Sequence, residues 1–362
     1  MLRIFGAPNR YLQGEGLVER LGTEVAAYGR SVIVVADDMV RSLLGERIRT
    51  TLRASDLEMS FAAFGGECTA AEIDRLSVEA SAAKAQVIVG VGGGKAIDAA
   101  KGACIATGAR LVIVPTIASN DSPTSRLSIV YDEHHVLREV RRLKVNPDVI
   151  LVDTSIILRA PERFFVSGIG DAISKKFEAA QCFAAGGENF YGGQPPYVAA
   201  VLADACYGAI RQHAEAALLA IRAGQGNEDF ERTVEATILL SGLAFENGGL
   251  SISHAMTRGL SAVPETGRAL HGEQVAFGLM VQLVAEGRPA SFVEDMAEFY
   301  RRVGLPLSLR DLGYEGDPAS VIPTIAQVSW ARAAYVQNMV PPSSESALAA
   351  AIEKADRFGR GG

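Results

Sequence analysis

Residues 86–101 read Gln-Val-Ile-Val-Gly-Val-Gly-Gly-Gly-Lys-Ala-Ile-Asp-Ala-Ala-Lys, an apolar run followed by a glycine-rich turn and a helical pattern. Such a turn exposes backbone N–H groups at a helix N-terminus, where they can bind phosphate. The spacing fits neither a P-loop nor Gly-x-Gly-x-x-Gly, because Ala96 follows Lys95 and Lys95 takes the last glycine position. We favour phosphate binding by Gly92, Gly93, Gly94 and Lys95; the alternative is a plain strand–helix turn that uses glycine for positive φ.

The same alternation of apolar runs and helical patterns continues on both sides of this turn. The runs are continuous rather than alternating, so both faces of the strands should be buried, and this predicts a parallel sheet covered by helices. Strands are predicted at 31–36, 59–64, 86–91, 110–114 and 148–153, helices at 38–53, 70–83 and 95–107, and a hairpin at 127–131 and 136–140.

Helical spacing dominates the chain from about residue 160 onward. We therefore predict two domains, an α/β domain over 1–160 and an all-helical domain over 161–362. A cleft between them is the expected ligand site, because small-molecule sites favour domain interfaces.

Composition excludes several classes of protein. The 362 residues are 48% hydrophobic and 21% charged, with a net charge of −7, which gives no sign of nucleic-acid binding. No apolar run is long enough to span a bilayer, and the N-terminus lacks a signal-peptide pattern. The four cysteines form no CxxC pair and indicate a reducing compartment. These features predict a cytoplasmic enzyme without a nucleic-acid or membrane partner.

Two further segments lie where open α/β sheets bind ligands, beyond the carboxyl ends of strands. Asp37 follows the strand 31–36, where a carboxylate can accept hydrogen bonds from an adenosine ribose and repel a 2′-phosphate; capping of the next helix is the rival interpretation. The loop 115–125 is dense in hydroxyl groups and contains Asp121. It is either part of a ligand site or a network of Asx and Ser/Thr turns.

Three residues far apart in the sequence are candidate metal ligands. Asp171, His254 and His271 each lie near glycine at the start of an apolar helical pattern. Two His and one Asp leave open coordination positions, as in catalytic zinc sites and ferrous facial triads. Taken alone, each residue is better explained as a buried or capping side chain, and their spacing forms no sequence motif.

Taken together, these segments resemble the glycerol dehydrogenases of the iron-containing alcohol dehydrogenase superfamily. The resemblance covers essentially the whole chain. It rests on Phe64-Gly-Gly-Glu-Cys68, Gly90–Lys101, Pro115–Ser125, Ala160-Pro-Glu-Arg163, Gly168-Ile-Gly-Asp-Ala172, Gly248–Gly259, Leu270–Gly278 and Ala355-Asp-Arg-Phe-Gly359.

The resemblance implies a Rossmann-like N-terminal domain and a helical C-terminal domain, an architecture similar to dehydroquinate synthase. It implies zinc bound by Asp171, His254 and His271, and a homo-oligomer between dimer and octamer. Iron-dependent relatives carry a further His where this chain has Lys175, so Fe²⁺ is less expected than Zn²⁺. The NAD site implied by the family comprises Asp37, Gly94, Lys95, Asp98, Thr116, Ser119, Ser125, Leu127 and Tyr131.

The implied reaction is oxidation of a polyol, glycerol to dihydroxyacetone, with hydride transfer to NAD. Zinc would lower the pKa of the bound alcohol, and the alkoxide carbon would lie about 3–3.5 Å from the acceptor ring. Asp121 falls where the family contacts the polyol near the metal. We expect either Asp121 or a relay of water and ribose hydroxyls to carry the proton.

The chain departs from the family's pattern around the first metal His. It reads His254-Ala-Met-Thr-Arg-Gly259, where glycerol dehydrogenases usually carry a second His and an Asn at positions 257 and 258. Lys175 and Arg258 each lie four residues after a candidate ligand and could bind an anionic substrate. Alternatively, both pair with surface carboxylates such as Glu178 or Glu265. Three other functions stay open: a dehydrogenase of an anionic alcohol such as a 2-hydroxy acid, a dehydroquinate synthase-like lyase, and a non-catalytic binding module.

Overall fold

The computed structural model describes residues 2–133 and 137–361. The chain forms two compact units. One contains residues 7–160 and 224–226, and the other contains the N-terminal residues up to Gly6 together with 161–223 and the chain from Asn227 onward.

The first unit is built on a six-stranded sheet in which every pair of neighbouring strands is parallel. The strand order is β1-β8-β5-β4-β2-β3. The strands are β1 (Tyr11–Gly14), β2 (Ser31–Ala36), β3 (Glu58–Ala63), β4 (Val87–Gly92), β5 (Arg110–Pro115) and β8 (Val149–Asp153).

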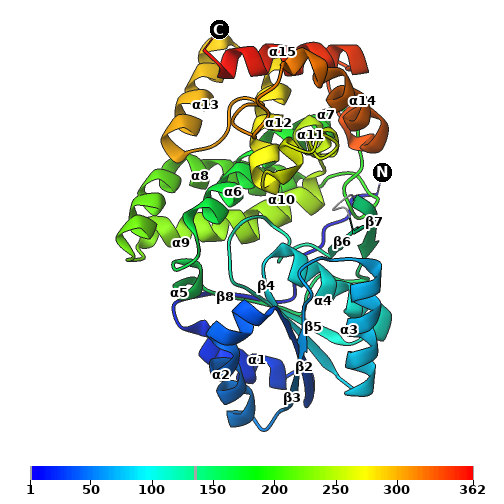
Figure 1. The fold of residues 1–362 in the computed structure, drawn as a ribbon, viewed down its shortest axis with the longest axis vertical. Helices are drawn as coiled ribbons and strands as arrows, with labels where there is room; N and C mark the ends of the chain where they lie inside the picture. The colour runs from blue at the N-terminus through cyan, green and yellow to red at the C-terminus, as the bar shows by residue number, and fades with distance from the viewer. Residues whose placement is uncertain (1, 134–136, 362) are drawn as a thin grey trace. The chain divides into compact units, whose positions relative to one another are not determined.

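Helices cover both faces of this sheet (Figure 1). Val32 and Val34 of β2 pack on one side with α1 (Leu21–Ala26) and α2 (Asp38–Ala54). Ile33 and Val35 pack on the other side with α3 (Ala70–Ala82) and α4 (Gly94–Thr107). Successive residues of a strand point to opposite faces, so the continuous apolar run of β2 serves both cores.

A separate antiparallel pair, β6 (Leu127–Tyr131) and β7 (Leu137–Arg142), follows β5. The predicted hairpin is thereby confirmed, although residues 134–136 of its turn lie outside the described part of the chain.

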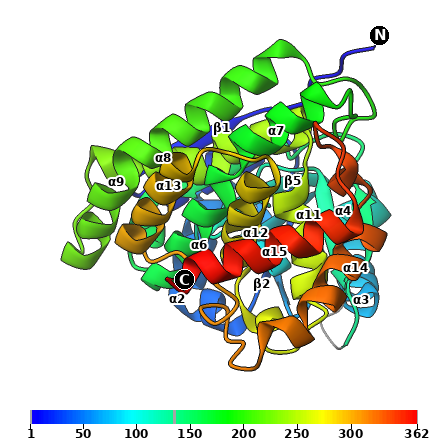
Figure 2. The ribbon, with the colours of Figure 1, turned by 90° about the horizontal axis from the view of Figure 1, so that it is seen from above.

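The second unit is helical. Its central helix is α12 (His271–Ala285), whose residues are buried almost all round, and α15 (Glu345–Gly359) packs across it (Figure 2). A helix that is apolar on every side must be surrounded by other parts of the protein. The others are α6 (Glu162–Ile173), α7 (Lys175–Ala184), α8 (Tyr197–Ala223), α9 (Glu228–Glu235), α10 (Ser241–Gly248), α11 (Ile252–Leu260), α13 (Ala290–Val303) and α14 (Ile322–Arg332).

The predicted fold class is confirmed: a parallel sheet flanked by helices precedes a helical part. The edge strand β1 was not predicted. Its four residues are all half-buried and form no apolar run, so the sequence carries no strand signal there. Among the described residues, no helix is both long and apolar enough to cross a membrane.

Candidate active site

All strands of the sheet are parallel, but the side on which the chain adds the next strand changes between β2 and β4. From β2 it proceeds to β3 on one side, and from β4 it proceeds to β5 on the other. Open α/β sheets bind ligands at such a change of side, outside the carboxyl ends of the strands. Asp37 and Gly92 lie at the carboxyl ends of the two strands that flank it.

The glycine-rich turn at the end of β4 has the backbone that phosphate binding needs. Gly92 has φ +151°, and a Cβ there would lie 2.9 Å from Cβ of Ala96. Gly93 is the N-cap of α4 and provides no side-chain cap. The first N–H groups of α4 are therefore available to a ligand anion. Lys95 bonds Glu67 at 2.7 Å and is 45% exposed, so its ammonium lies at the surface of this turn.

Asp37 caps α2, with its Oδ1 accepting a hydrogen bond from the N–H of Val40 at 2.7 Å. Helix capping is the alternative role that the sequence predicts for Asp37, and this contact shows it. It uses one carboxylate oxygen, and the ribose contact implied by the family stays a prediction.

A buried lysine that the sequence analysis missed organises the predicted coenzyme loop. Lys101 is 0% exposed, and its ammonium donates to Oδ1 of Asp98 at 3.2 Å and to the carbonyl oxygens of Ser122 and Leu127 at 2.6 and 2.7 Å. It also contacts Oγ of Ser125 at 3.2 Å. Burial raises the pKa of Asp98, although Lys101 and Ser122 act in the opposite direction.

The other predicted loop residues follow β5. Thr116 donates its N–H to Gly92, which ties the start of the loop to the end of β4. Ser119 and Asp121 are buried, and Tyr131 ends β6. The roles predicted for these three residues stay predictions.

The second unit brings the three candidate metal ligands together. One ligand atom from each of Asp171, His254 and His271 lies within 4.8 Å of the other two. Oδ1 of Asp171 is 3.2 Å from Nε2 of His254 and 4.0 Å from Nε2 of His271. Asp171 is on α6, His254 on α11 and His271 at the start of α12.

Glycines allow these three helices to approach closely. A Cβ at Gly272 would collide with the carbonyl oxygen of Ser167 on α6, and a Cβ at Gly278 would collide with that of Ser253 on α11. The N–H of Gly272 also donates to Oγ of Ser167 at 3.2 Å. The small residues in the sequence therefore set the spacing of the cluster.

Lys175 lies inside this cluster. Its ammonium donates to Oδ1 of Asp171 at 2.6 Å and lies 3.1 Å from Nε2 of His254. Both Lys175 and Asp171 are buried, with 1% and 0% of their side chains exposed. The alternative that Lys175 pairs with a surface carboxylate was wrong, because its partner is Asp171 and Glu178 is buried.

Glu178, one helical turn further along α7, holds His254 in place. Its Oε2 accepts from Nδ1 of His254 at 2.6 Å, and its Oε1 accepts from the N–H groups of His254 and Ser251 at 2.9 and 3.0 Å. Glu178 therefore orients the imidazole and satisfies the N-terminus of α11. The spacing Asp171-x6-Glu178, two turns of helix, was the signal that could have identified it.

The charged groups of the cluster shift one another's pKa. Burial raises the pKa of Asp171, but Lys175 and the two His residues outweigh it and hold this pKa far below its ordinary range. Burial raises the pKa of Glu178, but His254 outweighs burial and lowers this pKa. Burial lowers the pKa of His254, but chiefly Glu178 outweighs burial and raises this pKa. Loss of water and the positive charges of His254 and Lys175 lower the pKa of His271, whose side chain is still 43% exposed.

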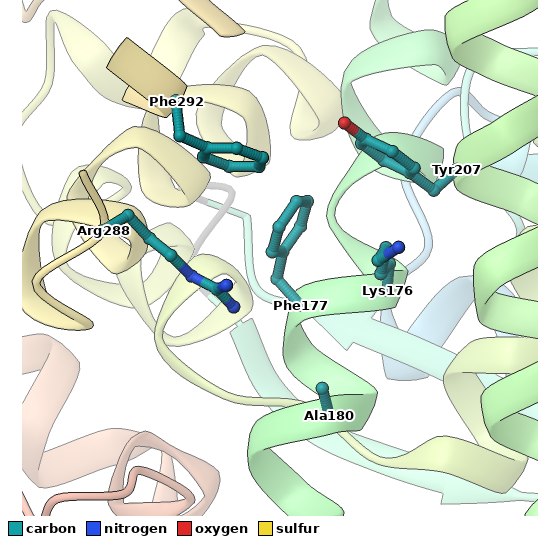
Figure 3. Close-up of a pocket in the computed structure, with 6 residues that line it drawn as sticks. All are labelled: Lys176, Phe177, Ala180, Tyr207, Arg288 and Phe292. Carbon is teal, nitrogen blue, oxygen red and sulfur yellow. The ribbon is translucent and has the colours of Figure 1, made fainter. Parts of the chain in front are cut away.

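Arg258 and Lys176 lie in different surroundings. The positive charge of Arg258 acts to lower the pKa of Tyr335, against the larger effect of burial, which raises this pKa. Lys176 pairs with Asp204 at 2.9 Å and lies 4.9 Å from the ring centre of Tyr207. Lys176 lines an apolar cavity of about 200 Å³ with Phe177, Ala180, Tyr207, Arg288 and Phe292 (Figure 3). The two adjacent lysines therefore have separate partners.

Comparison with known proteins assigns the family. The family model for iron-containing alcohol dehydrogenase matches residues 8–154. Glycerol dehydrogenase of Escherichia coli O6:H1 is 36% identical over 99% of this chain and 98% of its own length. Glycolaldehyde reductase of Halobacterium salinarum is 34% identical over 99% of both. The crystal structure of a probable glycerol dehydrogenase from Sinorhizobium meliloti 1021 matches with a TM-score of 0.94 and 38% identity over 99% of both chains. The chain therefore belongs to the iron-containing alcohol dehydrogenase family.

Proposed function

We propose that this protein transfers hydride between NAD and a small neutral vicinal diol, with glycerol and dihydroxyacetone as the expected pair. The observation that carries the proposal is full-length similarity to a glycerol dehydrogenase and a glycolaldehyde reductase, together with the clustered Asp171, His254 and His271. The names of both relatives describe redox chemistry at a carbon whose neighbour also bears oxygen.

NAD⁺ is the only co-reactant that the oxidation needs. A diol and NAD⁺ give an α-hydroxy carbonyl, NADH and a proton. The turn at Gly92–Gly94 would bind the pyrophosphate and Asp37 the ribose, while the cluster on α6, α11 and α12 would bind the reacting oxygen. Hydride transfer then requires the carbinol carbon to lie about 3–3.5 Å from the nicotinamide ring. Asp121 stays the predicted contact to the polyol.

Membership of the family implies a divalent metal as well as NAD. Two His and one Asp are a donor set that suits zinc, and the expectation of zinc over iron stays a prediction. The contacts of Lys175 bear directly on whether a metal binds here, because they involve two of the three candidate ligand residues.

The alternative of an anionic alcohol rested on Lys175 and Arg258. Lys175 is paired with the buried Asp171, so this cation is engaged within the protein. This favours neutral substrates. Full-length similarity to a dehydrogenase and a reductase likewise favours redox chemistry over a lyase or a non-catalytic module.

The test is NADH formation with glycerol, 1,2-propanediol, 2-hydroxybutyrate and glycerol phosphates. We expect turnover of the two neutral diols, and a loss of at least about 100-fold in Asp171→Asn and His254→Ala. His213→Ala is the control, since His213 on α8 pairs with Asp229 on α9, and neither helix carries a candidate metal ligand. Turnover of only the anionic compounds, or full activity in Asp171→Asn, would overturn the proposal.

The remaining expectations concern location and assembly. A cytoplasmic location and a homo-oligomer stay predictions. Light scattering on the purified protein would test the assembly state.

A further inference from the structure

We infer that the ammonium group of Lys175 takes the place of the divalent cation on Asp171 and His254, so that this chain works without a bound metal. The inference starts from the position of the Lys175 ammonium nitrogen, 2.6 Å from Oδ1 of Asp171 and 3.1 Å from Nε2 of His254. Both atoms belong to residues of the candidate metal site, and Nε2 is the imidazole nitrogen of His254 that does not contact Glu178.

The hydrogen-bonding capacity of His254 is the first argument. Its Nδ1 lies 2.6 Å from a carboxylate oxygen of Glu178, which can only accept, so Nδ1 carries a proton. In the neutral ring, the single lone pair of Nε2 accepts from Lys175; in the charged ring, Nε2 has no lone pair. In neither form does Nε2 have a lone pair that could bind a metal while Lys175 stays in this position.

The surroundings of the Lys175 ammonium are the second argument. Besides Asp171 and His254, it faces the ring of Phe245, whose centre is 5.5 Å away. The imidazole of His254 is parallel to the Phe245 ring, with an interplanar angle of 1° and centres 6.3 Å apart. A carboxylate, an imidazole nitrogen and an aromatic face together form a site suited to a cation.

Charge and burial are the third argument. The side chain of Lys175 is 1% exposed and that of Asp171 is 0% exposed. A metal that took Asp171 from Lys175 would leave a buried ammonium without its carboxylate, next to a second positive centre. Removing one partner of a buried pair and placing like charges together are both strongly unfavourable. The residues present therefore do not fit a divalent metal unless Lys175 moves.

The role inferred for Lys175 in the reaction rests on the proposed function. Lys175 fixes Asp171 and His254 and supplies positive charge beside the atoms that would receive the substrate oxygen. During oxidation, hydride passes from the carbinol carbon to NAD⁺ and the hydroxyl proton passes to water. Lys175 is thus a positioning residue and source of charge, and it undergoes no change in covalent bonding.

The experiment compares zinc binding by wild-type protein and by Lys175 variants. Lys175→Thr removes the ammonium, and Lys175→His replaces it by a further imidazole. Lys176→Thr is the matched control, because it removes a neighbouring ammonium that pairs with Asp204 instead. Zinc is measured by elemental analysis of the dialysed protein, by calorimetric titration, and by the zinc-dependent change in melting temperature.

We expect the wild type and Lys176→Thr to retain no stoichiometric zinc and to keep their activity in EDTA. Lys175→Thr and Lys175→His should bind zinc on the order of 100-fold more tightly or better, since one competing charge is removed. Their melting temperature should rise with zinc, whereas that of the wild type should change by less than about 1 °C. Without metal, Lys175→Thr should lose activity.

The outcomes separate this inference from the proposed function. One tightly bound zinc per wild-type chain, with activity lost in EDTA and restored by zinc, overturns the role of Lys175 and leaves the diol dehydrogenase proposal intact. Weak zinc binding by the wild type, with no NAD-linked turnover of any alcohol, supports the displacement of the metal by Lys175 but overturns both the metal-free activity and the proposed function. If Lys175→Thr does not fold, Lys175→His and the wild-type titration still decide the question.

Discussion

The ammonium of Lys175 lies 2.6 Å from Oδ1 of Asp171, in a site where both side chains are buried. The two residues are four positions apart, one at the end of α6 and the other at the start of α7, which places them on the same face. The family is implied to use a divalent metal. In this chain the ammonium of the Lys175 side chain places a positive charge beside Asp171, which is a predicted metal ligand.

Glu178→Gln should weaken both stability and catalysis. Glutamine can accept on one atom only, so it cannot satisfy His254 and the N-terminus of α11 together. We expect the free energy of unfolding to fall by about 2–3 kcal/mol. If His254 belongs to the active site, as proposed, we expect kcat/KM to fall about 10–100-fold, because the imidazole loses its orienting partner. Urea unfolding and NADH formation measure the two effects. Glu162→Gln is the control, since Glu162 pairs with Arg222 at the surface, and equal losses in both variants would contradict the account.

The Glu178 interaction should also depend on pH. The pKa of Glu178 is lowered in the folded state, so the ionised form stabilises the protein above the ordinary Glu pKa. This stabilisation is lost as the pH falls through the lowered, folded-state pKa. The difference in melting temperature between wild type and Glu178→Gln should therefore be large at neutral pH and shrink in acid. A difference that grows as the pH falls would contradict the assignment.

Two substitutions separate the roles of Asp37. Asparagine caps helices as well as aspartate, so Asp37→Asn should change stability by less than about 0.5 kcal/mol. Asp37→Ala should cost about 1 kcal/mol, because α2 loses its cap. If Asp37 also faces the ribose, both variants should bind NADPH about 5–10-fold more tightly, since one repulsive charge is gone. Fluorescence titration with NADH and NADPH measures this. An unchanged preference in Asp37→Asn would leave Asp37 with the capping role alone.

Lys101→Met should destabilise the α/β unit by about 3–5 kcal/mol, since it leaves the buried Asp98 carboxylate without its cation. The loop from Ser122 to Leu127 also loses its anchor, so NADH affinity should fall. The double variant Asp98→Asn, Lys101→Met should be more stable than Lys101→Met, because no unpaired charge remains. Thermal unfolding tests the order. A double variant less stable than Lys101→Met would show that the charge of Asp98 is not the cause.

Gly92→Ala should weaken coenzyme binding as well as folding. The φ of +151° and the nearby Cβ of Ala96 together predict a cost of about 1–3 kcal/mol. Gly66→Ala is the control, since Gly66 has φ +97° but open space around it. Both should lower the melting temperature, whereas only Gly92→Ala should raise the Kd for NADH. Equal NADH affinity in the two variants would remove the glycine turn from the coenzyme site.

The sequence predicts the elements of the fold correctly where buried residues form a regular apolar pattern. The run Val32–Ala36 predicts a strand covered on both faces, and Val32 and Ile33 do pack into opposite cores. The edge strand β1 could not be predicted, because Tyr11–Gly14 are only half-buried and their pairing with β8 depends on a segment about 140 residues away.

For the cluster, the sequence supplied the members but not their partners. Asp171, His254 and His271 do lie together, as the resemblance implied. The direction of Lys175 could not be predicted, since a helical residue at that position can turn toward Asp171 or toward solvent, and packing decides. Glu178 and Lys101 were missed for a related reason. A charged residue normally indicates surface, and only the three-dimensional structure shows buried partners that compensate for its burial.

The most direct test of the account is the turnover of glycerol and 1,2-propanediol by wild-type protein from which metal has been removed, with the metal content of the same sample measured. The account predicts unchanged NADH formation at well below one metal ion per chain, because the ammonium of Lys175 already occupies Asp171 and His254. Turnover that disappears with the metal and returns in proportion to added zinc would contradict it.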